Sequence, residues 1–333
     1  MLDEGTFTFN SSVPVGVVAI QGFTNQRSEF LMSMLPVASL GDANNTTTLL
    51  PLFADGGGWT TELVLTNTSD DPVTGTVQFF GHGSANEDAA PLSLVVNGVA
   101  DSTFTYGIPP RSAVRLATGN SGETVQTGSV QITPAAGNIP VAVAIFSSRD
   151  RGVVVTRGSV IAAPTGSTFR MYAETSGAIT EGGSVQSGVA IANPAQMPVT
   201  VNIALRQMDG STLGDPVTLT IPAGGQVAEF VKEIFPSSPD NFRGFVTVTA
   251  TSEVGVVGLR SRYNERGDFL ITTTPPRNES QTFTDSDILL PHVVSSGGYS
   301  SQFVIFGQDG SGGIYFNSAD GTLMPEGSLS PVQ

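Results

Sequence analysis

The chain has 333 residues, a formal net charge of −15 and no cysteine. This length can hold two or three domains of ordinary size, each with its own core. The negative charge argues against nucleic acid or an anionic membrane as a partner, because no basic stripe exists to neutralise phosphate. The lack of cysteine excludes disulfides, thiol catalysis and zinc sites built on cysteine.

Charged residues make up only 13% of the chain and glycine is abundant, at 39 residues. This composition favours short strands joined by tight turns over helices. No apolar run reaches about 18 residues, so we predict no membrane-spanning helix. The first residues lack a basic stretch followed by an apolar one, so we expect no secretion signal within this sequence.

Apolar residues recur in the two patterns that are typical of strands. Residues 61–67, 75–80 and 216–221 alternate with a period near two, which predicts strands with one buried face. Residues 15–20 and 141–146 are continuous apolar runs, which predict inner strands covered on both faces.

Turn and helix signals lie between these segments. Asp-Gly pairs at 209–210, 309–310 and 320–321 predict hairpin turns. Residues 226–235 place Val and Ile side chains at helical spacing, and Pro236 follows, which predicts one short helix. Six to eight short strands in about 110 residues are typical of an antiparallel sandwich.

The strongest pattern is a repeat made of two alternating halves. Residues 5–36 recur at 244–275, an offset of 239, and residues 49–65 recur at 289–305, an offset of 240. Self-similarity at a fixed period indicates a repeat architecture. The predicted fold is therefore all-β, with tandem antiparallel β-sandwich repeats like immunoglobulin or fibronectin domains and one short helix.

Polar stretches at 38–48 and 277–282 both follow the same half of the repeat and resemble linkers. They set the predicted boundaries of two complete sandwich repeats and two half-repeats. The boundaries are 49–164 and 168–276 for the complete repeats, 1–40 for an isolated C-terminal half and 288–333 for an isolated N-terminal half.

Three stretches carry a resemblance to a known family: residues 54–67, residues 264–276, and the bend Ile108-Pro109-Pro110-Arg111. They resemble a tandem repeat of large exported proteins from soil and environmental bacteria, acidobacteria in particular. The resemblance covers nearly the whole chain. It implies export and a β-rich repeat architecture, and it implies no chemistry.

No residue pattern predicts catalysis. His82 and His292 lack the partners that a catalytic or metal-binding histidine needs, so we expect structural or solvated roles for both. Nucleophile-elbow, zinc-protease and phosphate-loop motifs are absent from the sequence. We therefore predict that the protein is not an enzyme, with no catalytic, cofactor-binding or metal residues.

Two further patterns can be interpreted either as ordinary solvated turns or as a specific binding site. Arg266-Gly267-Asp268 resembles an adhesive tripeptide, but the sister repeat reads Arg27-Ser28-Glu29, which indicates a charged hairpin turn. Acidic loops at 67–71, 87–88 and 285–287 could supply oxygen ligands to calcium, although none has the spacing of a calcium loop. Solvated turns explain them better, and calcium is the only cofactor left open.

Trp59 and Tyr299 occupy matched positions after glycines. Such an aromatic can form a platform for a sugar ring or pack against a core or a neighbouring domain, and we favour packing. The sugar-platform interpretation keeps glycans as a candidate partner, whereas the Asn-x-Ser/Thr triplets are expected by chance in a chain rich in Thr and Asn. The alternative function is thus a cell-surface adhesive or carbohydrate-binding module that is monomeric or closes on itself.

The half-repeats at the two ends predict assembly. Half a sandwich exposes an apolar sheet face and open strand edges, which something must cover. We predict a secreted or cell-surface structural protein that polymerises head to tail, as a homopolymer, by complementation between the two halves. The predicted interface residues are Phe7, Phe9, Val15, Val17, Val18, Ile20, Phe303, Val304, Ile305 and Phe306. Residues 15–20 should pair with a segment like 303–306, from the same chain or from the next.

Overall fold

The structure is a computed structural model, and it divides into two compact units, residues 1–292 and residues 293–333. The described residues are 5–35, 37–38, 40, 45–84, 87–162, 164–281, 289–294, 297–298, 300–305, 314–318 and 320–323. Within them the chain is nearly all β with antiparallel pairing, which confirms the predicted all-β class. No helix among these residues is long and apolar enough to cross a membrane.

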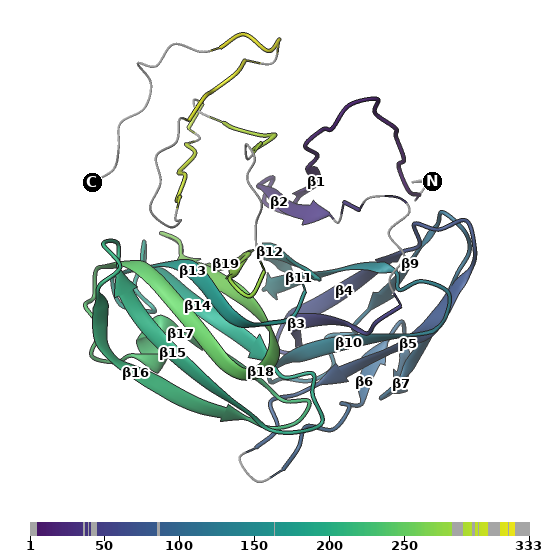
Figure 1. The fold of residues 1–333 in the computed structure, drawn as a ribbon, viewed down its shortest axis with the longest axis horizontal. Helices are drawn as coiled ribbons and strands as arrows, with labels where there is room; N and C mark the ends of the chain where they lie inside the picture. The colour runs from purple at the N-terminus through teal and green to yellow at the C-terminus, as the bar shows by residue number, and fades with distance from the viewer. Residues whose placement is uncertain are drawn as a thin grey trace. The chain divides into compact units, whose positions relative to one another are not determined.

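An N-terminal hairpin opens the fold (Figure 1). Its strands are β1 (Ala19–Thr24) and β2 (Phe30–Leu35). They pair with Thr24 opposite Phe30 and Ala19 opposite Leu35.

Ten strands follow and form what we call the first sandwich. Two sheets face each other in it, with the orders β3-β10-β5-β8 and β12-β11-β4-β9, and β6 and β7 form a separate two-stranded sheet. The strands are β3 (Thr48–Asp55), β4 (Trp59–Thr66), β5 (Val73–Phe80), β6 (Leu94–Val96), β7 (Val99–Asp101), β8 (Phe104–Ile108), β9 (Ala113–Ala117), β10 (Gln126–Ala136), β11 (Val141–Asp150) and β12 (Val153–Ile161).

The remaining strands form the second sandwich. Its strands form one eight-stranded sheet, whose two layers are joined by the 22-residue strand β18: β18 pairs with β13 and β15 in its first part, and with β14 and β19 in its second part. The elements are β13 (Gly166–Ser176), β14 (Val185–Ala192), β15 (Val199–Gln207), β16 (Thr212–Ile221), β17 (Gln226–Phe230), α1 (Val231–Ile234), β18 (Phe242–Tyr263), β19 (Phe269–Thr274) and β20 (Arg277–Asn278).

The two sandwiches have the same strand order. In the second, β13-β18-β15-β16 corresponds to β3-β10-β5-β8, and β19-β18-β14-β17 corresponds to β12-β11-β4-β9. Two buried cores are present, one around Phe53 and Phe79 and the other around Ile191 and Ile203, and the first extends to Ala190, Val257 and Leu259 of the second sandwich. Apolar side chains on alternate positions of facing strands fill these cores, as the period of two requires.

Two buried asparagines end equivalent strands in the same way. The Asn67 side-chain amide donates to the carbonyls of Asp71, Ile108 and Pro109 at 2.8–3.2 Å. The Asn193 amide donates to those of Met197, Ile221 and Pro222 at 2.8–3.2 Å. Asn67 follows β4 and Asn193 follows β14, so the two asparagines mark the same structural position in both sandwiches.

The predicted helix at 226–235 is mostly wrong. Its first part is β17, which pairs with β14, and only Val231–Ile234 is helical. Over so few residues the hydrophobic spacing fits a helix or a strand. A strand is favoured because it can form backbone hydrogen bonds with the edge of β14, which a helix could not.

Two other expectations need correction. Residues 141–146 lie in β11 between β12 and β4 as predicted, but residues 15–18 form no strand and are exposed. Nothing in the described chain covers them on both faces. The predicted linker at 277–282 begins with β20, which pairs with β13.

Candidate assembly interface

The N-terminal hairpin and the β18–β19 hairpin share one turn design. Asn25 Oδ1 accepts from the backbone N–H groups of Arg27 and Glu29, both at 2.9 Å. Asn264 Oδ1 accepts from those of Arg266 and Asp268, also at 2.9 Å. The pairing register also matches, because Tyr263 lies opposite Phe269 as Thr24 lies opposite Phe30, at the offset of 239.

The position between Arg and the acidic residue needs a left-handed backbone in both turns. Gly267 has φ 81° there and Ser28 has φ 61°. This conformation is easy for glycine and uncommon for serine. The shared Asn, Arg and acidic residue therefore specify a hairpin turn, and the tripeptide Arg266-Gly267-Asp268 is one version of it.

Reciprocal ion pairs join the two turns, and we call this set of contacts the clasp. Arg27 donates to both carboxylate oxygens of Asp268, at 2.8 and 3.3 Å, and Arg266 pairs with Glu29. Asp268 is nearly buried. Since its carboxylate is bound by Arg27, Arg266 and Asn264, it is not displayed as a free adhesive loop would display it.

One face of the N-terminal hairpin is docked on β12. Gln21 accepts from the Arg157 guanidinium at 2.9 Å, and that guanidinium lies 5.4 Å from the Phe23 ring centre. The Asn25 amide donates to the Val154 carbonyl at 2.9 Å. These contacts attach the N-terminal hairpin to the first sandwich without extending a sheet.

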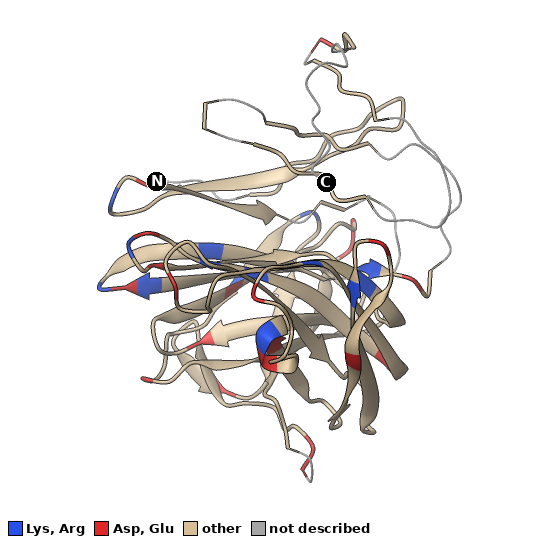
Figure 2. Ribbon diagram, turned by 90° about the vertical axis from the view of Figure 1, so that its left-hand side faces the viewer, with Lys and Arg blue, Asp and Glu red and all other residues tan. Residues whose placement is uncertain are grey.

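The opposite face of the N-terminal hairpin is apolar and exposed. Ile20 is 44% exposed, Phe30 59% and Met32 51%. The strands carry no charged residue, and the charges of this hairpin gather at its turn, as the colouring in Figure 2 shows. The sequence-based interface prediction missed Phe30, Met32 and Met34. Their spacing of two residues was a signal that they share one apolar face of a strand.

The predicted N-terminal interface residues share this exposure. Phe7 is 87% exposed, and Phe9, Val15, Val17 and Val18 are all exposed as well. Leu289 lies against Gly16, as Leu49 lies against Gly255. In the described chain β1 pairs with β2 alone, so its other edge has no strand partner.

The predicted C-terminal interface residues are only partly described. Phe303 and Val304 are half-buried, Ile305 is 69% exposed, and none of the three lies in a strand. The Phe303 ring packs edge-on against Phe316, with centres 5.7 Å apart. Phe306 and Tyr299 lie outside the described residues.

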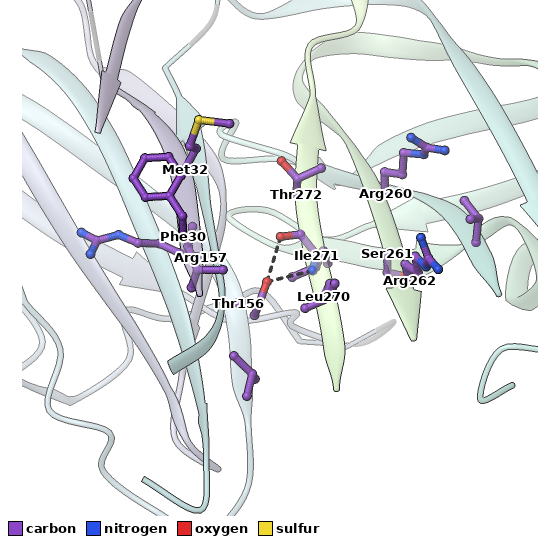
Figure 3. Close-up of a pocket in the computed structure, with 13 residues that line it drawn as sticks. Phe30, Met32, Thr156, Arg157, Arg260, Ser261, Arg262, Leu270, Ile271 and Thr272 are labelled. Carbon is purple, nitrogen blue, oxygen red and sulfur yellow. Dashed lines mark hydrogen bonds between the residues drawn. The ribbon is translucent and has the colours of Figure 1, made fainter. Parts of the chain in front are cut away.

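An open pocket of about 420 Å³ lies where β2, β12 and β19 approach each other. Phe30 and Met32 stand on one side, and Leu270, Ile271 and Thr272 on the other (Figure 3). Thr156 bridges β12 and β19, since its hydroxyl contacts both the N–H and the carbonyl of Ile271. The pocket is thus a gap between three hairpins lined mainly by apolar side chains.

Trp59 does not stand in an open loop. It is half-buried, and its ring lies 6.1 Å from that of Phe146 and 6.3 Å from that of Phe269. Phe146 belongs to the first sandwich and Phe269 to the second. The indole therefore packs where the two sandwiches meet, which leaves little of it to stack on a sugar.

The histidines and acidic loops have structural surroundings where they are described. His82 contacts the Gln226 carbonyl at 3.0 Å and Thr127 at 2.9 Å, and His292 is exposed. Asp70 is bound by Arg111 at 2.8 Å, and Asp88 accepts from the Ala223 N–H. Residues 285–287 lie outside the described chain, and no group of three metal-ligand side chains gathers within it.

Comparison of the chain with protein families, curated proteins and solved structures found no match.

The clasp between the two turns should open in acid. Burial alone raises the pKa of Asp268, but hydrogen bonds from Arg27, Asn264 and Arg266 outweigh it and lower the pKa below its ordinary 3.8. The Asn25 hydrogen bond lowers that of Glu29 below 4.5. A carboxylate whose pKa is lower in the folded protein than in the unfolded chain stabilises the fold at any pH above the unfolded-state pKa. This stabilisation is lost as the pH falls through the folded-state pKa. The N-terminal hairpin should therefore stay docked from pH 7 to 5 and loosen below about 4.

Hydrogen exchange of residues 19–35 measures this loosening. Asp268→Asn should speed exchange roughly fivefold at pH 7, while Asp70→Asn, which breaks a distant pair, should leave it unchanged. Equal exchange in wild type and Asp268→Asn would show that the clasp does not hold the N-terminal hairpin.

Proposed function

We propose that this chain is an extracellular, non-enzymatic structural protein whose copies join head to tail into a filament by half-domain complementation. The observation that carries the proposal is the N-terminal hairpin. It has the turn and register of β18–β19, but within the described residues no strand pairs with β1 as β14 pairs with β18.

The unpaired edge of β1 is a template for another strand, because its backbone groups can be satisfied by strand addition. The exposed apolar side chains beside it add a hydrophobic contribution of about 1.5–3 kcal/mol for each one that becomes buried. The surface involved is neutral, so the net charge of −15 does not oppose contact at short range.

The extracellular location rests on the resemblance of the repeat motifs to exported bacterial proteins. The non-enzymatic nature rests on the sequence, which has no cysteine and no catalytic motif. It also rests on the His82 side chain, whose two ring nitrogens contact the Gln226 carbonyl and the Thr127 hydroxyl. A contact between different surfaces of successive copies propagates as a filament unless it closes into a ring.

Electron microscopy and sedimentation of the full chain test the proposal. We expect polymers from the full chain and monomers after deletion of residues 1–37. Ile20→Asp should weaken association roughly 30-fold, about 2 kcal/mol, with the fold unchanged because Ile20 is already exposed. Val99→Asp, which charges an exposed valine on β7, is the matched control. A full chain that stays monomeric, or a deletion variant that still polymerises, would exclude this function.

A further inference from the structure

The structure contains two examples of how a hairpin of this type receives its missing strand. In the first sandwich, β11 of the β11–β12 hairpin pairs with β4, and Ala144 lies opposite Leu63. In the second, β18 of the β18–β19 hairpin pairs with β14, and Gly258 lies opposite Val189. In each case a small residue on the hairpin faces an apolar residue on the added strand.

The two examples agree in register. Leu63 stands four residues before Asn67 and Val189 four before Asn193, and these asparagines make the same three hydrogen bonds. Leu63 and Val189 are therefore equivalent positions. Ala144 and Gly258, which lie opposite them, are equivalent as well.

The third hairpin supplies the same small residue. The offset of 239 that relates the turns and registers of β1–β2 and β18–β19 carries Gly258 to Ala19. The offset of 240 in the other half-repeat carries Leu63 to Phe303. If both offsets hold, Phe303 belongs opposite Ala19, with Val304 opposite Val18.

Building on the proposed function, we infer that residues 301–305 of a second copy pair antiparallel with residues 17–21, with Phe303 opposite Ala19. The segment Ser301-Gln302-Phe303-Val304-Ile305 has no charge and is rich in residues that favour strands. Residues 301–305 form no strand, and residues 15–18 form none either. A second copy supplies this segment in a contact that can repeat from copy to copy.

Single cysteines test the register, because the chain has none of its own. A full-length Ala19→Cys variant is mixed with a full-length Phe303→Cys variant under mild oxidation, and a Val18→Cys and Val304→Cys mixture is run beside it. Adjacent antiparallel pairs alternate in spacing, so at least one mixture should hold its cysteines close enough for a disulfide. The control is Ala19→Cys with Ser301→Cys, which lies two residues out of register at roughly 7–8 Å.

We expect a disulfide-linked mixed dimer in an in-register mixture, at about ten times the yield of the control. Equal yields in the three mixtures would overturn the register. A disulfide that forms within one chain of an Ala19→Cys/Phe303→Cys double variant, with no mixed dimer, would overturn the second copy as occupant. Polymers that survive deletion of residues 1–37 would instead overturn the proposed function, so the failures can be told apart.

Discussion

Gly244→Ala is expected to destabilise the second sandwich by about 3 kcal/mol, whereas Gly5→Ala should leave the stability of the isolated chain unchanged. The two glycines are equivalent, at the offset of 239. A Cβ on Gly244 would lie 2.0 Å from the Arg206 carbonyl oxygen on β15, so β18 would have to move away from its partner. A Cβ on Gly5 would meet nothing within 4 Å.

Gly128 shows that the close approach belongs to the position in both sandwiches. Its Cβ would lie 1.8 Å from the Phe80 carbonyl oxygen on β5. Gly5 differs because the described chain places no strand beside it. If a second copy supplies that strand, Gly5→Ala should leave unfolding unchanged and weaken polymerisation about tenfold or more.

Denaturant unfolding followed by circular dichroism measures the stability of the two glycine variants, and sedimentation measures their polymers. A Gly244→Ala protein as stable as wild type would contradict the predicted clash. If the Gly5→Ala protein polymerises normally, no strand of a second copy packs beside Gly5 in the polymer.

Asn193→Ala should cost about 2–3 kcal/mol of folding free energy. Asn193 is 1% exposed, and its amide donates to three carbonyls, of which that of Ile221 is reached through a fully buried hydrogen bond. Alanine removes the donors and leaves those carbonyls without them, which costs more than the net worth of a hydrogen bond. Asn67→Ala should have a similar effect on the first sandwich.

Asn202→Ala is the matched control, because Asn202 is exposed on β15 and bonds only to the Thr218 hydroxyl. It should change the unfolding free energy by less than about 0.5 kcal/mol. If the Asn193→Ala and Asn202→Ala variants have the same unfolding midpoint, the buried Asn193 amide does not stabilise the fold more than an exposed one.

Local chemistry made several features readable from the sequence. The alternation in residues 61–67 predicted β4, and the Asp-Gly pair at 209–210 predicted the turn between β15 and β16, where Gly210 has φ 85°. The matched tripeptides Arg27-Ser28-Glu29 and Arg266-Gly267-Asp268 predicted a charged hairpin turn. Each of these depends on residues a few positions apart, whose preferences act directly on the backbone between them.

Other features depended on partners far away in the chain. Residues 226–230 became a strand because β14 lies beside them, although their own spacing suggested a helix. The run at 15–18 is continuously apolar like that at 141–146, yet only the second has strands on both sides in the described chain. The clasp of Arg27 with Asp268 joins residues 241 positions apart and had no signal beyond the repeated turn.

The sequence alone determined the all-β class, the repeat and its offsets, and the chemistry of the turns, because strand periodicity and turn preferences are local. Only the tertiary structure decided which strands share a sheet, that β18 joins both layers of the second sandwich, and which face of the N-terminal hairpin docks on β12. Those outcomes depend on which distant surfaces can bury each other and satisfy each other's backbone groups, and a local pattern does not contain that information.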